Sequence, residues 1–327
     1  ILENADLWEV IVLYAGSAEA LKAAFSDYEI TFLLNNYAIF RLPENAIPAL
    51  AGSPLVIYVE KPKRLFFSLL GAKRISCISA VQNARPGLSG APSLTGRDTL
   101  VAVIDSGIDY THPDFRTPDG SSRIRFLWDQ TIAPDSAKGY ASPPGYSLGS
   151  VFSGEELDKA LNAATIAERE RICPSRDTSG HGTHVSGIAA GNGRASDGVY
   201  RGVAYEAELL VVKLGSPARN GFPSTTELMQ AVDFCARYAI SQNRPLAINL
   251  SFGNTYGSHS GTSLLETYLN SVARLGILSI VVGSGNEGNA AGHTGGRLRG
   301  GETRRVEFSV GEYESSLSIQ LWKNYWD

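Results

Sequence analysis

A carboxylate at position 105 stands where α/β proteins hold catalytic groups. Residues 103–109 read Val-Ile-Asp-Ser-Gly-Ile-Asp, and Asp105 directly follows the apolar run of residues 99–104. The carboxyl ends of parallel strands carry ligand-binding and catalytic side chains in open α/β sheets, so Asp105 is placed to orient an imidazole. The motif alone fits equally well a carboxylate that caps a turn. Asp105 therefore needs a partner before a role can be assigned.

The imidazole candidate is His181, at the start of a predicted helix of small residues. Residues 180–191 read Gly-His-Gly-Thr-His-Val-Ser-Gly-Ile-Ala-Ala-Gly, which places His181 and His184 three residues apart. Two histidines on one helix can indicate a metal site. The H-E-x-x-H arrangement is absent, and the sequence offers no third ligand nearby, so we assign no metal. We expect His181 to be the catalytic base and His184 to be structural.

A carboxamide at position 286 completes the set. Asn286 follows an apolar run at 277–282 and two glycines, within Val-Val-Gly-Ser-Gly-Asn-Glu-Gly at 281–288. An amide NH₂ is a neutral donor suited to a developing oxyanion. Asparagine also adopts left-handed turns readily, so a purely conformational role stays open for Asn286.

The elements that must position these groups follow a β-α-β pattern. Strand candidates alternate with helix candidates, at 99–104, 209–213, 225–240, 246–250, 263–275 and 277–282. This pattern predicts an α/β fold, with a mainly parallel sheet and helices on both faces. Residues 120–178 are rich in Pro, Gly and Ser and contain a helix candidate at 155–172, so we interpret them as a surface insertion.

Composition shifts predict four segments. Residues 1–82 form a small α+β unit, with strand or helix candidates at 8–14, 18–25, 37–42, 43–50 and 56–59. Residues 83–98 are rich in Asn, Pro, Gly and Ser and form a linker, and residues 99–302 form the α/β domain. Residues 303–327 alternate with a period of two, which predicts antiparallel strands.

Composition also excludes several classes of protein. The 327 residues carry a net charge of -4 without a long basic block, which argues against a nucleic-acid binder. No apolar stretch reaches the ~18 residues of a membrane span, and the first residues lack the pattern of a signal peptide. The three cysteines (77, 173 and 235) are far apart, which favours thiols over a disulfide framework. No G-x-G-x-x-G turn follows Asp105, which argues against a dinucleotide enzyme.

Taken together, these motifs resemble the subtilase family of serine peptidases. The matching stretches are 103–109, 112–115, 180–187, 249–253 and 285–288. Residues 61–64, 127–131 and 257–263 are similar in particular to the clostridial germination (Csp-type) proteases. The resemblance implies that residues 1–82 are a prodomain acting as chaperone and inhibitor. It also implies that residues 303–327 begin a β-sandwich insertion in the peptidase domain of residues 99–302.

The resemblance further implies hydrolysis of a peptide bond through an acyl-enzyme. Asp105 would orient His181, His181 would activate a serine, and Asn286 would stabilise the oxyanion. A protein or peptide substrate would bind as an extended strand between two segments, Leu214, Gly215 and Ser216 on one side and Ser251, Phe252 and Gly253 on the other. Phe252 is alternatively a core residue. Asp114 matches a calcium-binding aspartate of some relatives, but the asparagine-rich loop of that site is not evident, so calcium stays open and no other cofactor is implied.

The nucleophile of this family is a serine that follows the oxyanion asparagine in the chain. Ser263, in Gly-Thr-Ser, precedes Asn286 and stands where it can cap a helix. We therefore expect the nucleophile beyond residue 327, with this chain alone incomplete. The alternative is a catalytically inactive pseudopeptidase that acts as a regulatory binding scaffold. The resemblance to this branch further implies activation of a spore-cortex hydrolase zymogen and a spore-associated or cytoplasmic location. Because the strand-rich N-terminal unit ends just before the Pro/Gly linker, we also expect self-processing near residues 77–86.

Overall fold

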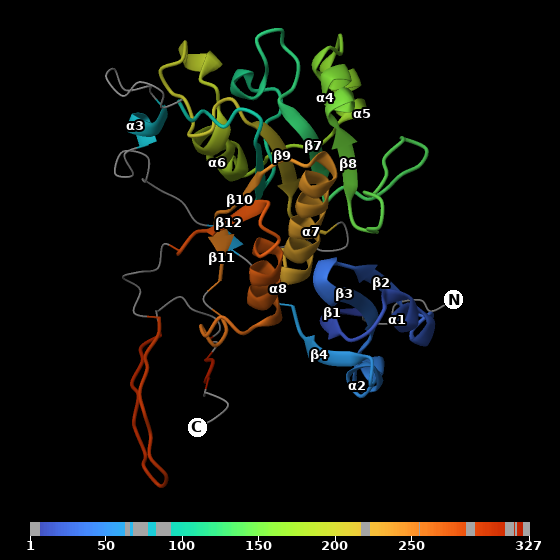
Figure 1. The fold of residues 1–327 in the computed structure, drawn as a ribbon, viewed down its shortest axis with the longest axis vertical. Helices are drawn as coiled ribbons and strands as arrows, with labels where there is room; N and C mark the ends of the chain where they lie inside the picture. The colour runs from blue at the N-terminus through green and yellow to red at the C-terminus, as the bar shows by residue number, and fades with distance from the viewer. Residues whose placement is uncertain are drawn as a thin grey trace.

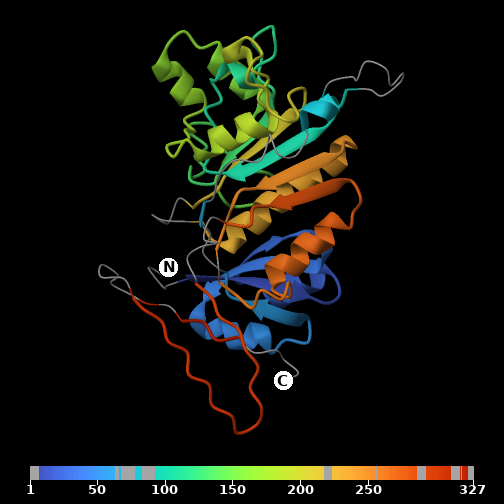
Figure 2. The ribbon, with the colours of Figure 1, turned by 90° about the vertical axis from the view of Figure 1, so that its left-hand side faces the viewer.

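Two β-sheets of different size organise the chain (Figures 1 and 2). The computed structural model describes residues 7–62, 66–67, 78–82, 93–216, 223–254, 256–285, 292–310, 317 and 319–322. Within these ranges, no helix combines the length and the apolar character that crossing a membrane requires.

The N-terminal unit is a four-stranded antiparallel sheet with the order β2-β3-β1-β4. Its strands are β1 (Leu7–Tyr14), β2 (Glu29–Phe32), β3 (Tyr37–Pro43) and β4 (Val56–Glu60), and its helical elements are α1 (Ala18–Ala24), η1 (Leu34–Asn36), η2 (Glu44–Ala46) and α2 (Ile47–Ala51). Ser17 caps α1, because its side chain accepts a hydrogen bond from the Ala20 N–H at 3.2 Å. The predicted elements are present, and β2 is an additional strand that the sequence analysis missed.

The larger sheet has the order β12-β10-β6-β9-β7-β8, and every neighbouring pair is parallel except β7 with β8. The strands are β6 (Leu100–Asp105), β7 (Ile124–Asp129), β8 (Ser150–Ser153), β9 (Glu208–Lys213), β10 (Leu246–Leu250) and β12 (Leu278–Val282). The prediction of a mainly parallel sheet is confirmed.

The interpretation of residues 120–178 as a surface insertion was wrong for β7 and β8. β7 lies between β9 and β8, and Trp128 on it is fully buried. The predicted helix at 155–172 is two helices, α4 (Gly154–Leu161) and α5 (Ile166–Ile172). Thr165 starts the second one, because its side chain accepts a hydrogen bond from the Glu168 N–H. A new N-cap within the run therefore ends one helix and begins the next.

Helices cover both faces of the larger sheet, which explains the continuous apolar character of β6. Leu100, Ala102 and Ile104 point to the face that packs against α7 (Thr225–Gln242) and α8 (Leu264–Ala273). Val101 and Val103 point to the opposite face, where α4 and α6 (His181–Ala190) contribute buried residues. A strand buried on both sides needs apolar residues at every position, and only its last residue, Asp105, is charged.

The N-terminal sheet packs on α7 and α8, as both ribbon views show. Ile11, Leu33, Tyr37 and Ile39 are buried in the same apolar cluster as residues of these two helices. The contact has a polar centre at Asp233 of α7. This fully buried carboxylate accepts a hydrogen bond from the Leu34 N–H at 2.7 Å. It also accepts hydrogen bonds from the side chains of Tyr146, Tyr268 and Arg237.

Two short elements, which lie in the chain between the N-terminal unit and the larger domain, contact the larger domain. β5 (Phe66–Phe67) pairs with β11 (Phe252–Gly253) in an antiparallel two-stranded sheet. α3 (Ile78–Gln82) is tied to the segment that follows α6, because Gln82 Nε2 donates to the carbonyl oxygens of Gly202 and Val203 at 2.8 and 2.7 Å. Gln82 thus contacts the domain that follows the predicted linker.

The predicted antiparallel strands at 303–327 are not present among the described residues of that segment. No strand is assigned to the described residues after Val282, and Val306, Phe308 and Val310 are exposed. Alternation with a period of two produces a strand only where a neighbouring strand supplies hydrogen bonds and an apolar layer. Residues 311–316, 318 and 323–327 lie outside the described part of the chain.

Candidate active site

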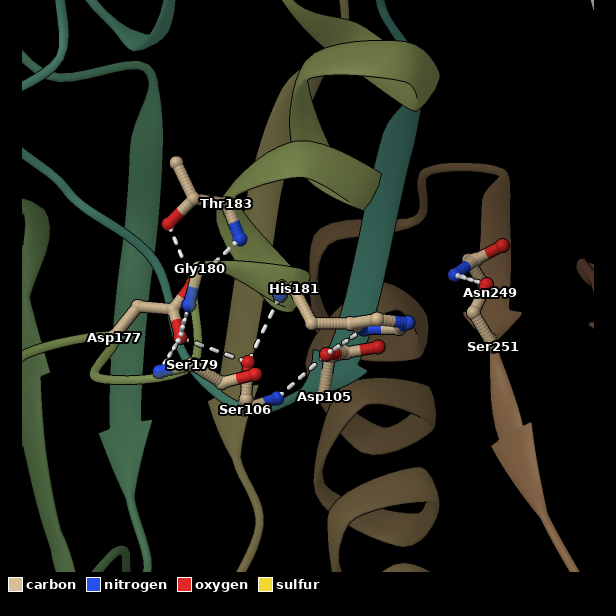
Figure 3. Close-up of polar contacts among 10 residues, drawn as sticks. Asp105, Ser106, Asp177, Ser179, Gly180, His181, Thr183, Asn249 and Ser251 are labelled. Carbon is tan, nitrogen blue, oxygen red and sulfur yellow. Dashed lines mark hydrogen bonds and ion pairs between the residues drawn. The ribbon is translucent and has the colours of Figure 1, made fainter. Parts of the chain in front are cut away.

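Asp105 and His181 meet at the carboxyl edge of the larger sheet (Figure 3). Asp105 is the last residue of β6, and His181 is the first residue of α6. His181 Nδ1 lies 2.6 Å from Asp105 Oδ1, with 11% of the imidazole side chain and 1% of the carboxylate side chain exposed. The structure therefore brings together two groups that are 76 positions apart in the sequence.

Burial and two hydrogen bonds have opposite effects on the pKa of the Asp105 carboxylate. Burial raises the pKa of Asp105, while hydrogen bonds from the Ser106 N–H and from His181 oppose that rise. The Ser106 N–H donates to Oδ1 at 2.7 Å, and Oδ2 is buried without a hydrogen-bond partner among the described residues. A neutral imidazole that donates from Nδ1 carries its lone pair on Nε2, as a general base requires.

Two glycines set the position of His181. Gly180 is the N-cap residue of α6 and has a left-handed backbone, with φ at 75°. Gly182 lies against the loop that follows Asp105: a Cβ at this position would overlap the carbonyl oxygen of Gly107 and lie 3.0 Å from its nitrogen. The absence of a side chain at 182 therefore lets the start of α6 approach the end of β6 closely enough for the Asp105–His181 contact.

The first segment predicted to bind substrate, residues 251–253, directly follows β10. Its β11 residues pair with β5, with Phe252 opposite Phe67 and Gly253 opposite Phe66. Phe252 is 3% exposed and belongs to the main apolar cluster, so its ring is a core residue, which was the alternative interpretation. Its backbone pairs with β5. Ser251 Oγ accepts a hydrogen bond from Asn249 Nδ2 at 2.8 Å (Figure 3).

The segment Leu214, Gly215 and Ser216 leaves the sheet beside the same carboxylate. The Leu214 N–H donates to the carbonyl oxygen of Asp105 at 2.9 Å, and the side chain of Leu214 is buried. The Gly215 N–H lies 3.3 Å from Gln130 Oε1. Both predicted substrate segments thus begin where their strands end, at the edge that holds Asp105. Between β5 and residues 214–216, the described residues contain no strand pairing.

Asn286 lies outside the described residues, so its predicted oxyanion role stays a prediction. Ser263 is the N-cap residue of α8: its Oγ accepts from the Glu266 N–H at 3.3 Å and donates to Glu266 Oε2 at 2.6 Å. This capping box occupies the hydroxyl group, as the sequence predicts for a helix N-cap.

Asp114, the aspartate for which calcium is left open, has one carboxylate oxygen engaged by the main chain. Asp114 Oδ1 accepts a hydrogen bond from the Ala195 N–H at 2.7 Å, so that oxygen is engaged in holding a loop. Within the described ranges there is no group of three or more His, Cys, Asp or Glu side chains able to hold a metal ion. We derive no step through calcium.

Comparisons with known proteins agree on one family. A model described as the subtilase family matches residues 96–318, and a model described as the Csp protease B prodomain matches residues 2–63. The chain is 30% identical to Subtilisin E of Bacillus subtilis over 286 residues, which cover 87% of this chain and 55% of that protein. It is 35% identical to the minor extracellular protease Epr of the same species, over 88% of this chain and 37% of Epr.

Among solved structures, the chain is similar to the Clostridium perfringens CspB protease, with a TM-score of 0.57 and 34% sequence identity. The similarity covers 69% of this chain and 43% of that one. The chain thus spans about half, or less, of the length of these relatives.

Proposed function

Because the chain belongs to the subtilase family, we propose that it supplies the Asp–His pair and the prodomain of a serine endopeptidase. The observation that supports this most directly is the 2.6 Å contact between His181 Nδ1 and the buried Asp105 carboxylate. A carboxylate on Nδ1 fixes the tautomer of the imidazole and stabilises the imidazolium that forms when Nε2 takes a proton.

The proposed reaction is hydrolysis of a peptide bond in two stages. In the first stage, His181 removes the proton of a serine hydroxyl while the serine oxygen attacks the substrate carbonyl carbon, and then returns the proton to the leaving amine, which leaves an acyl-serine. In the second stage, His181 takes a proton from a water molecule that attacks the acyl carbon, and returns it to the serine oxygen as the carboxyl product leaves. Asn286 donates to the oxyanion of the tetrahedral intermediate. We place the nucleophilic serine in sequence after residue 327, since Ser263, the Gly-Thr-Ser candidate within the chain, is committed to capping α8.

We further propose that the N-terminal unit inhibits the enzyme. Two observations support this. Ile11, Leu33, Tyr37 and Ile39 share an apolar cluster with α7 and α8. In addition, β5, which follows that unit in the chain, pairs with β11 in the manner proposed for a substrate strand. The chain's own backbone then occupies an edge that a substrate needs.

The match of the N-terminal unit to a Csp-type prodomain suggests a class of substrate. Because residues 2–63 match the Csp protease B prodomain, we propose that the full-length protein activates a spore-cortex hydrolase zymogen and is associated with the spore. The test is incubation of the full-length protein with the hydrolase precursor. Cleavage of the precursor at a defined peptide bond, absent with His181→Ala, is the expected result.

A fluorophosphonate label tests the catalytic proposal, because it reacts with a serine that a histidine activates. We expect the full-length protein to be labelled, His181→Ala to lose labelling, and Asp105→Asn to lose about four orders of magnitude in rate. His184→Ala is the matched control, because His184 lies one turn further along α6 and is exposed. Labelling that survives His181→Ala unchanged would exclude the proposed pair. Absence of labelling in the unmodified protein would favour a binding scaffold.

A further inference from the structure

Asp177 lies four residues before His181, in the loop that leads into α6, and its carboxylate accepts five hydrogen bonds (Figure 3). Oδ1 accepts from Ser106 Oγ at 2.8 Å, Ser179 N at 3.2 Å and Gly180 N at 2.9 Å. Oδ2 accepts from the main-chain N–H and from the hydroxyl of Thr183, at 2.8 and 2.6 Å. All five partners donate, so the site requires a group that only accepts, which is an ionised carboxylate.

Two hydroxyl groups connect this carboxylate to the segment that holds Asp105. Ser106 Oγ donates to Asp177 and accepts from the Gly182 N–H at 2.9 Å. Thr183 Oγ1 donates to Asp177 and accepts from the Asp109 N–H at 2.8 Å. A hydroxyl has one proton, so donation to Asp177 leaves each oxygen free to accept from the other segment. By accepting the proton of each hydroxyl, Asp177 fixes both oxygens as acceptors in the two hydrogen bonds that join residues 106–109 to the first turn of α6.

The charge of Asp177 also suits its position. Partial burial opposes its ionisation, but the hydrogen bonds from Thr183, Ser106 and Gly180 together lower the pKa of Asp177. The N–H groups of Gly182 and Thr183 belong to the first turn of α6 and have no partner within the helix, so an anion is stabilised there.

We propose that Asp177 is a positioning residue for the catalytic pair, holding Ser106 and the start of α6 so that Asp105 and His181 keep their contact. Ser106 carries this effect to Asp105, because its N–H donates to Asp105 Oδ1 while its hydroxyl is held by Asp177. The proposal rests on the proposed function, since it concerns the same pair. Asp177 acts through Ser106 and Thr183 and has no role in proton transfer.

Asp177→Asn tests the requirement for a pure acceptor with almost no change in shape. The amide must turn its NH₂ group either toward the donors on Oδ1 or toward the donors on Oδ2, so at least two donors lose their acceptor in either orientation. Asp158→Asn is the matched control. Asp158 is a carboxylate on α4 that accepts a main-chain hydrogen bond from Ser122 N at 2.6 Å, away from His181.

Two readouts in the full-length protein separate this proposal from a purely structural role. The first is the 15N shift of each ring nitrogen of His181, which reports the tautomer of the neutral imidazole. The second is the rate of fluorophosphonate labelling per folded molecule. We expect Asp177→Asn to mix the two tautomers and to slow labelling about 10- to 100-fold, the range expected from a misplacement near 1 Å. Asp158→Asn should change neither readout.

Unchanged ring shifts and an unchanged labelling rate in folded Asp177→Asn would overturn the proposal, even if the melting temperature falls. Thr183→Val and Thr183→Ser form a second pair that decides the matter if Asp177→Asn does not fold. Valine removes the hydroxyl link and should reproduce both effects, while serine keeps the link and should retain the tautomer and rate of the unmodified protein. If the unmodified protein is not labelled at all, the proposed function fails, and the ring shifts alone still decide the role of Asp177.

Discussion

A single methyl group at position 182 should separate the catalytic pair. A Cβ on Gly182 would overlap the carbonyl oxygen of Gly107 and lie 3.0 and 3.1 Å from the nitrogen and carbonyl carbon of the same residue. These are backbone atoms, which cannot rotate away as a flexible side chain can. Restoring ordinary contact distances requires the start of α6 to move by about 1 Å relative to the loop after β6.

A shift of that size acts directly on the contact between His181 and Asp105, which measures 2.6 Å. Misplacement of a catalytic group by about 1 Å can cost on the order of 100-fold in rate. We therefore expect Gly182→Ala in the full-length protein to slow fluorophosphonate labelling by about that factor. Circular dichroism and the melting temperature would establish that the variant is folded before the rates are compared.

Gly187→Ala is the control on the same helix, because a Cβ at 187 would meet no atom of the described residues within 4 Å, apart from the backbone of its own helix. Replacement of glycine by alanine within a helix stabilises by roughly 0.5–1 kcal/mol, so this variant should label at the unmodified rate and melt slightly higher. If folded Gly182→Ala labels as fast as Gly187→Ala, close approach at Gly107 does not position His181, and the reasoning is refuted.

Three further predictions concern residues outside the pair. Ser263→Ala should cost about 1 kcal/mol of stability through the lost cap of α8 but leave the labelling stoichiometry unchanged; loss of the label would make Ser263 the nucleophile instead. The pKa of Asp177 is lowered on folding, so its contribution to stability is present above the ordinary carboxyl pKa and is lost as the pH falls through the lower folded value. The difference in unfolding free energy between the unmodified protein and Asp177→Asn, measured in urea, should therefore be smaller at about pH 3 than at about pH 7, and equal differences would contradict this. Burial raises the pKa of Cys173 to about 12 and also raises the pKa of Cys235, so both thiols should resist alkylation until the protein unfolds; rapid native modification detected by mass spectrometry would show that these sites open.

The sequence predicted the positions of Asp105 and His181 because each depends on a local rule. Asp105 ends a strand whose other five residues are all apolar, and His181 begins a helix flanked by glycines. The rule that catalytic groups gather at the carboxyl ends of parallel strands then places them at one edge. No such rule applies to Asp177. Four of its five donors lie within six residues of it, in the same loop and the first turn of α6, and the fifth, Ser106, is 71 positions away, so only the folded chain completes the set.

β7 and the segment after residue 303 were harder to predict. β7 (Ile-Arg-Phe-Leu-Trp-Asp) is mostly apolar, but it is short and lies within a region rich in Pro, Gly and Ser, so the composition of the whole region resembles a surface loop. The burial of β7 comes from β9 and β8 on either side. At Val306 and Phe308 the alternation predicts a strand, whereas no strand includes the described residues of that segment and both side chains are exposed. In both cases, whether the segment forms a strand depends on pairing with a neighbouring strand, which the local residue pattern does not indicate.

The most direct test of a serine peptidase built on Asp105 and His181 is to identify the residue that a fluorophosphonate modifies in the full-length protein, by peptide mass spectrometry, with and without His181→Ala. The expected result is one modified serine that follows Asn286 in the chain, with its modification abolished when the imidazole is removed. Modification that persists in His181→Ala at the same rate, or that falls on Ser263, would contradict the assignment of His181 as the general base for a downstream nucleophile.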